Sequence, residues 1–119
     1  MQDFRNLKVW EKGHTLTLEI YRATKSFPRD EVYGLTSQMR RASASIGANI
    51  AEGSCRKGDV DFARFLQMAV GSASELEYHL LLAHDLDLLK TSDYHRLSSE
   101  AVEVKRMLSS LVRKLRAES

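Results

Sequence analysis

The stretch that decides the fold is Leu35–Gly53, which reads LTSQMRRASASIGANIAEG. On a helix, which turns about 100° per residue, it has one narrow apolar face: Leu35, Met39, Ala42, Ile46, Ile50 and Gly53. A wholly polar stripe lies beside this face: Gln38, Arg41, Ser45, Asn49 and Glu52. Apart from Arg40, the residues of the remaining arc have small side chains: Thr36, Ser37, Ser43, Ala44, Gly47, Ala48 and Ala51. Because a surface helix usually carries long charged side chains opposite its core, this arc predicts a second close packing contact.

The polar stripe has two interpretations. In the first it simply faces water. In the second it lies in an interface between copies of the chain, together with two alanines of the small arc: Gln38, Arg41, Ser45, Ala48, Asn49, Ala51 and Glu52. The second interpretation needs a partner for each charged group, because a buried Arg or Glu without one is costly. We favour the interface, because the adjoining arc is small and not charged.

Three further helices are expected, over about 7–26, 60–89 and 94–116. Pro28 ends the first, because its ring disfavours helical geometry at Phe27. Their apolar positions recur every three or four residues: Trp10, Gly13, Leu16, Ile20, Ala23 and Phe27, then Phe62, Phe65, Leu66, Ala69, Ala73, Leu76, Leu80 and Ala83, then Tyr94, Leu97, Ala101, Val104, Leu108, Leu111 and Leu115. A tight polar turn at 90–93 favours antiparallel neighbours. The pattern predicts an all-α, up-down-up-down four-helix bundle.

Helix ends and close contacts can also be predicted. The expected N-terminal caps are Thr36 or Ser37, Asp59 or Asp61, and Ser92. Gly53 is expected to end its helix in a left-handed conformation, which glycine adopts readily. Gly13 interrupts a helical pattern at a cost of roughly 1 kcal/mol relative to Ala, which predicts close approach of a neighbour there.

Composition indicates one domain over 1–119 and an expected location in the cytoplasm. The chain has 119 residues, 43% apolar and 29% charged, with one proline and six glycines. These values suit a globular helical domain. Cys55 is the only cysteine, so no intrachain disulfide can form and a reducing compartment is expected. The start has no apolar signal region, and the longest nearly uncharged run, Phe65–Ser74, is too short to span a bilayer.

The sequence predicts no catalytic, cofactor-binding or metal-binding residues. Glu11 and His14 form a single Glu-x-x-His pair, whereas a carboxylate-bridged metal pair in a bundle needs two such motifs. Positive charge beside Cys55 could activate its thiol, but no feature selects a histidine as its base. Neither of the glycine motifs that bind phosphate, GxGxxG and GxxxxGK(S/T), occurs in the sequence. We therefore expect no enzyme, no cofactor and no small-molecule substrate; a metal-dependent bundle enzyme is the least favoured hypothesis.

The basic residues have two interpretations. The net charge is +2, from 18 basic and 16 acidic residues, which is too balanced to indicate nucleic-acid binding by charge alone. Ordinary solvated charge therefore explains them in a monomer. In a ring each patch is multiplied, and a surface for RNA becomes more credible. The candidate nucleic-acid-binding residues are Lys8, Lys12, Arg22, Lys25, Arg56, Lys57, Arg113, Lys114 and Arg116.

The runs 35–42 and 45–53, together with Asp61-Phe62-Arg64-Phe65-Leu66, resemble a known family. They are similar to the four-helix-bundle proteins encoded in intervening sequences of bacterial 23S ribosomal RNA genes. One departure is Gly47, where the family commonly has proline. The resemblance implies an all-α bundle that forms a homopentameric ring, with no enzymatic activity. The chain is also similar to the accessory protein of diversity-generating retroelements, which binds nucleic acid and a reverse transcriptase.

Two hypotheses about function follow. In the first, the chain is a non-enzymatic homo-oligomer, as a pentamer, that associates with RNA or a ribonucleoprotein. In the second, it is a protein–protein assembly module with no nucleic-acid ligand. Neither hypothesis involves a membrane.

Overall fold

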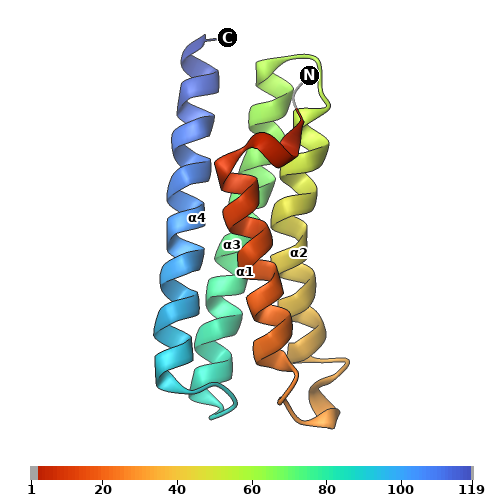
Figure 1. Cartoon of the computed structure of the whole chain (residues 1–119), viewed down its shortest axis with the longest axis vertical. Helices are drawn as coiled ribbons and strands as arrows, with labels where there is room; N and C mark the ends of the chain where they lie inside the picture. Colours follow the sequence, from red (N-terminus) through yellow and green to blue (C-terminus); the bar gives the residue numbers. More distant parts are fainter. Residues whose placement is uncertain (1–2, 119) are drawn as a thin grey trace.

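The computed structural model describes residues 3–118, which form four long helices and two short ones. The long helices are α1 (Lys8–Thr24), α2 (Leu35–Ser54), α3 (Asp59–Asp85) and α4 (Thr91–Glu118). The short 3₁₀ helices are η1 (Phe4–Asn6) and η2 (Arg29–Glu31). The long helices lie side by side along one axis, and both chain termini lie at the same end of the bundle as the α2–α3 loop (Figure 1). The fold is all-α with four packed helices, as predicted.

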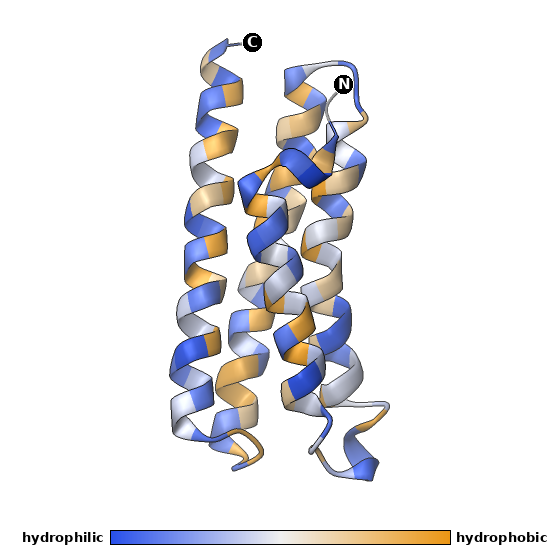
Figure 2. Cartoon of the chain, in the orientation of Figure 1, coloured by the Kyte–Doolittle hydropathy of each residue, from blue (hydrophilic) through white to orange (hydrophobic). Residues whose placement is uncertain are grey.

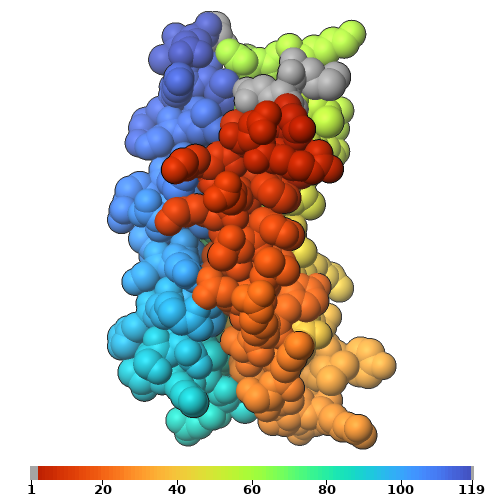
Figure 3. Space-filling view, in the orientation of Figure 1, coloured from red at the N-terminus to blue at the C-terminus, as the bar shows by residue number. Residues whose placement is uncertain are grey.

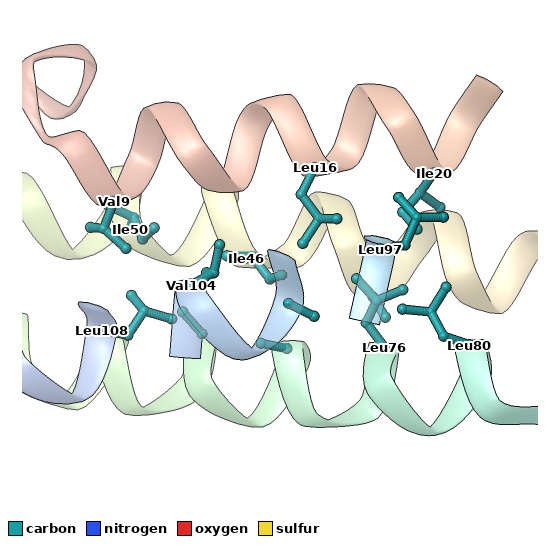
Figure 4. Packing of buried hydrophobic residues seen from close by; sticks show 14 of the residues in the cluster. Val9, Leu16, Ile20, Ile46, Ile50, Leu76, Leu80, Leu97, Val104 and Leu108 are labelled. Atoms are coloured by element: carbon teal, nitrogen blue, oxygen red, sulfur yellow. The ribbon is translucent and has the colours of Figure 1, made fainter. Parts of the chain in front are cut away.

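The core runs along the middle of the bundle, and the predicted face of α2 is buried in it. Hydrophobic and hydrophilic residues alternate along each long helix (Figure 2), and buried hydrophobic residues of all four long helices form one cluster. Figure 4 shows side chains of all four long helices meeting in this core: Val9, Leu16, Ile20, Ile46, Ile50, Leu76, Leu80, Leu97, Val104 and Leu108. All eight predicted core positions of α3 are buried as well. Four buried apolar residues within 3–118 were not among the predicted core positions: Val9, Ala63, Leu89 and Val112. Four predicted core positions are only partly buried: Trp10, Ala23, Tyr94 and Leu111.

Helices α1 and α2 approach each other closely. A Cβ atom added at Gly13 would lie 3.1 Å from Cγ2 of Ile46, which confirms the predicted close approach. Another, added at Gly47, would lie 3.2 Å from Nε1 of Trp10. Along α1 the first contact is made by Trp10 and the second by Gly13, whereas their partners Gly47 and Ile46 follow the reverse order in α2. The closeness of the two helices explains why α2 has small residues on the side that faces α1.

Gly53 does not end α2 in the left-handed conformation that the sequence suggested. It lies inside the helix, and no glycine among residues 3–118 has a positive φ. A Cβ atom there would lie 2.7 Å from Cβ of Phe65 and 2.9 Å from Cδ1 of Phe62. The glycine is therefore required by the tight packing of α2 against the start of α3.

The predicted caps are wrong. Helix α2 begins at Leu35 and α3 at Asp59, after Gly34 and Gly58, so all the proposed cap residues lie inside helices: Thr36, Ser37, Asp59, Asp61 and Ser92. The Glu31 carboxylate takes over the capping role at α2, because its Oε1 accepts a hydrogen bond from the Leu35 amide at 3.1 Å. Asp59 and Asp61 still lie in the first turn of α3, where negative charge is favourable.

The turn between α3 and α4 also lies earlier than predicted, at 86–90 in place of 90–93. Helix α3 ends at Asp85, and two residues later Asp87 has a φ of 61°, a left-handed conformation that reverses the chain. Nε2 of His84 and Oγ1 of Thr91 lie 3.1 Å apart and tie the two helices together.

Candidate interaction surfaces

The outward face of α2 is made mainly of small side chains. Ala44 and Ala48 are exposed and Ala51 is half-buried, with exposed Arg41 and Glu52 beside them. The side chain of Glu52 is paired with Arg56 one turn later, where Nη2 and Oε2 lie 2.8 Å apart. Because Ala44, Ala48 and Ala51 all have short side chains, another backbone could approach this face closely.

The predicted polar stripe divides into two parts. Gln38, like Arg41 and Glu52, is exposed, whereas Ser45 and Asn49 are half-buried against α3. Nδ2 of Asn49 donates to the Ser45 carbonyl at 2.9 Å, and the hydroxyl groups of Ser72 and Ser45 are hydrogen-bonded at 3.0 Å. Ser45 and Asn49 therefore have polar partners within their own chain.

Part of the small arc meets α1 of the same chain and not another copy. Ser43 is buried, and its carbonyl accepts a hydrogen bond from the Thr17 hydroxyl at 2.9 Å. Further along the seam, Nε of Arg40 donates to Oγ1 of Thr24 at 2.9 Å. The second packing contact predicted for α2 is thus partly made within the chain. Of the small arc, the outward alanines are the residues that could still contact another molecule.

The candidate nucleic-acid-binding residues are spread over both ends of the bundle. Seven lie on segments towards the end that holds the termini and two towards the opposite end (Figure 1): Lys8, Lys12, Arg56, Lys57, Arg113, Lys114 and Arg116, then Arg22 and Lys25. Because they are divided in this way, they do not form a single surface on one copy of the chain.

A cleft of about 450 Å³ between the start of α1 and the end of α4 brings two of these residues together. Lys8 and Lys114 line it with Arg106, around an apolar wall that includes Met107 and Leu111. Within residues 3–118 no carboxylate pairs with either lysine, whereas Arg106 is paired with a glutamate of its own helix. We call this the α1–α4 basic cleft.

A second cleft, of about 600 Å³, lies between the end of α1 and the start of α2. Lys25 and Arg41 both line it, although the sequence placed them on different surfaces. Arg29 and Arg40 line it as well. The sequence suggested a basic patch of Arg22, Lys25 and Arg29, but not that Arg40 and Arg41 of α2 would join Lys25 and Arg29 there. The sequence feature that could have indicated this cleft is the connector 28–34. It is long enough for the basic residues at the end of α1 to lie beside those at the start of α2.

The seam between α1 and α4 holds an acidic pair. Burial and the nearby charge of Glu19 raise the pKa of Glu100 to about 7, while the charges of Arg96 and Lys12 act in the opposite direction. Arg96 also forms an ion pair with Glu19. This seam therefore has a group that titrates near neutral pH.

The histidines make separate contacts. His14 stacks on Trp10 with ring centroids 4.8 Å apart, and His84 stacks on Tyr94 at 4.7 Å. Residues 3–118 contain no cluster of three or more His, Cys, Asp or Glu side chains that could hold a metal ion. Cys55 is exposed and unbonded at the end of α2. None of the helices in this part of the chain is both long and apolar enough to cross a membrane.

These features define a small all-α protein, a four-helix bundle with a small-residue outer face and two basic clefts. The chain belongs to the 23S rRNA-intervening sequence protein family, whose model matches residues 5–110. This confirms the resemblance seen in the sequence. No curated protein matches the chain significantly.

The chain is similar to a solved structure of a protein of unknown function from the S23 ribosomal protein family of Bacteroides thetaiotaomicron VPI-5482. The TM-score is 0.81 at 24% identity, and the match covers 88% of this chain and 95% of that one. At this identity the similarity supports the shared fold alone.

Proposed function

We propose that this chain is a non-enzymatic cytoplasmic protein whose up-down-up-down bundle assembles into a ring-like homo-oligomer, as a pentamer, that associates with RNA or a ribonucleoprotein. The observation that carries the assembly is the outward face of α2, where Ala44 and Ala48 are exposed between Arg41 and Glu52. A helix backbone of a second copy can approach such a face closely, and the charged residues beside it supply polar contacts at the rim.

A ring requires this face to meet a different face of the neighbouring copy. Contacts between unlike faces are heterologous, and they close into a ring when the rotation between copies allows it. The residues proposed to make the contact are Gln38, Arg41, Ala48, Ala51 and Glu52. Ser45 and Asn49, which are half-buried against α3, support the face from beneath.

The RNA contact is proposed at the α1–α4 basic cleft. Its lysines, Lys8 and Lys114, are free of carboxylate partners in residues 3–118 and can therefore bind phosphate without breaking an ion pair. Assembly strengthens this contact, because a ring would present several copies of the cleft. Membership of the family supports the proposal through its link to ribosomal RNA genes.

The test of assembly is the mass of the purified protein by light scattering, compared with Ala48→Leu. We expect a multiple of the 13.5 kDa chain for the wild type and a smaller mass for the variant. Helix content should not change, because Ala48 is exposed and leucine is a good helix former. Ser74→Leu, on an exposed position of α3, is the matched control and should keep the wild-type mass. A wild-type monomer would refute the proposal.

The same preparation separates the two hypotheses for function. Assembly with no RNA bound at low salt would favour the protein–protein assembly module. In that case a protein partner should be captured from lysate after nuclease treatment.

A further inference from the structure

We propose that the cleft between the end of α1 and the start of α2 binds a phosphate group. We call it the α1–α2 cleft, and its charged wall is formed by Lys25, Arg29, Arg40 and Arg41. It lies at the end of the bundle opposite the chain termini, beside the connector that projects from the body of the molecule (Figure 3). The proposal does not depend on ring assembly or on the α1–α4 basic cleft.

The first argument is uncompensated positive charge. No carboxylate lines the α1–α2 cleft, and within residues 3–118 no ion pair involves Lys25, Arg29 or Arg41. The acidic residues of η2 are Asp30 and Glu31, and Glu31 already accepts a hydrogen bond from the α2 backbone. Four cations around one cleft create a strongly positive potential, which favours a multiply charged anion over a single carboxylate.

The second argument is that one of these cations is held in place. Nε of Arg40 donates to Oγ1 of Thr24 at 2.9 Å, and Nη2 donates to the Tyr21 carbonyl at 3.3 Å. The guanidinium also lies 4.7 Å from the centroid of the Tyr21 ring. These contacts leave Nη1 without a hydrogen-bond partner in the described residues. A guanidinium fixed in this way loses little entropy when it binds phosphate.

The third argument is an unpartnered hydroxyl at the cleft. Thr36 is only 6% exposed, and its Oγ1 has no hydrogen-bond partner within residues 3–118. Buried hydroxyl groups are normally hydrogen-bonded, so this one points to an acceptor that occupies the cleft. Thr36 is the second residue of α2, where the backbone N–H groups of Thr36 and Ser37 have no acceptor within residues 3–118 and the helix dipole favours an anion. A phosphate oxygen would satisfy these donors together.

The size of the cleft indicates that the phosphate carries a larger group. A cleft of about 600 Å³ falls in the range typical of small-molecule sites and exceeds what phosphate alone fills. The Tyr21 ring and the side chains of Phe27 and Val32 supply an apolar wall for that group. The terminal phosphate of an RNA strand and a free nucleotide share this chemistry.

The experiment is calorimetric titration at low salt with four probes. They are inorganic phosphate, AMP, and two RNA oligonucleotides that differ only in a 5′-phosphate. We expect saturable binding of at least one phosphate-bearing probe, and weaker or no binding of the 5′-hydroxyl oligonucleotide. Preference for the phosphorylated RNA over AMP would assign the site to an RNA end, and the reverse preference would assign it to a nucleotide.

Two substitutions locate the binding. Thr36→Val removes the hydroxyl at nearly constant volume and should weaken binding about tenfold, as expected for one hydrogen bond to a charged group. It should not lower the melting temperature, because that hydroxyl now lacks a partner. Lys25→Gln combined with Arg29→Gln should weaken binding about 100-fold. The matched control, Lys8→Gln with Lys114→Gln at the other end of the bundle, should bind inorganic phosphate and AMP as the wild type does.

The proposal fails if none of the phosphate-bearing probes binds. It also fails if Thr36→Val binds as tightly as the wild type, because surface charge alone would then explain the affinity. Loss of AMP and inorganic phosphate binding in the Lys8 and Lys114 control, with Thr36→Val unaffected, would place the phosphate contact in the α1–α4 basic cleft instead.

Discussion

Glu19 on α1 and Glu100 on α4 line the same cleft at the seam between these helices, and Oε2 of Glu100 is buried without a hydrogen-bond partner in residues 3–118. Burial and the nearby charge of Glu19 both disfavour the ionised form of Glu100, so Glu100 holds its proton to a higher pH than an exposed carboxyl group does. Together they raise the pKa of Glu100 from 4.5 to about 7, so Glu100 is protonated in part of the molecules at neutral pH. The α1–α4 seam should therefore respond to pH near neutrality.

The first prediction is that stability falls as the pH rises through this range. Because the pKa of Glu100 is higher in the folded chain, the folded state binds more protons between about pH 4.5 and 7. The stabilisation is complete below that range and is lost as the pH rises through 7. We expect a loss of about 1 kcal/mol, since water partly screens the pair. Urea unfolding at pH 5, 6, 7 and 8 measures it.

Glu100→Gln should remove most of this pH dependence and make the variant more stable than the wild type at pH 8. The matched control is Glu103→Gln, one turn away on α4, whose carboxylate is paired with Arg106. Its free energy of unfolding should depend on pH as that of the wild type does. Equal slopes in the wild type and Glu100→Gln would contradict the prediction.

The core could be predicted from the sequence because its signal is periodic. On α3 and on the apolar face of α2, every residue expected in the core is buried, since a helix that packs on one side repeats every three or four residues. Helix ends were less predictable, because Glu31 caps α2 from a neighbouring element and Asp87 reverses the chain through its own backbone angle. Neither feature can be predicted from the pattern of neighbouring residues in the sequence.

The surfaces could be predicted only in part, because they depend on which helices become neighbours. Small residues occur in α2 for two different reasons, and the sequence alone does not distinguish them. Ser43 and Gly47 are small because α1 packs against them, whereas Ala44 and Ala48 face outward. The α1–α2 cleft combines residues from three elements, so no single stretch of sequence contains its signal.

The second prediction concerns two glycines with opposite surroundings. Gly53→Ala would place a Cβ atom 2.7 Å from Cβ of Phe65, so the helices must move apart and we expect a loss of about 1–3 kcal/mol. Gly71→Ala is the control, because an added Cβ there meets nothing within 4 Å. It should raise stability by about 1 kcal/mol, since alanine favours the helix over glycine. Urea unfolding of both variants checks the signs, and a stable Gly53→Ala would show that the seam can relax.

The third prediction concerns the salt dependence of RNA binding. Lys114 lines the α1–α4 basic cleft and no carboxylate in residues 3–118 pairs with it, so each RNA contact there should displace a counterion. If the wild type binds a single-stranded RNA oligonucleotide, Lys114→Gln should lower affinity and reduce the slope of log K against log salt by about 0.7. Lys90→Gln removes an exposed lysine from the turn at the opposite end of the bundle and should leave the slope unchanged. Fluorescence anisotropy over a range of salt concentrations measures both slopes. Equal reductions in the two variants would mean that RNA contacts the whole charged surface and does not select this cleft.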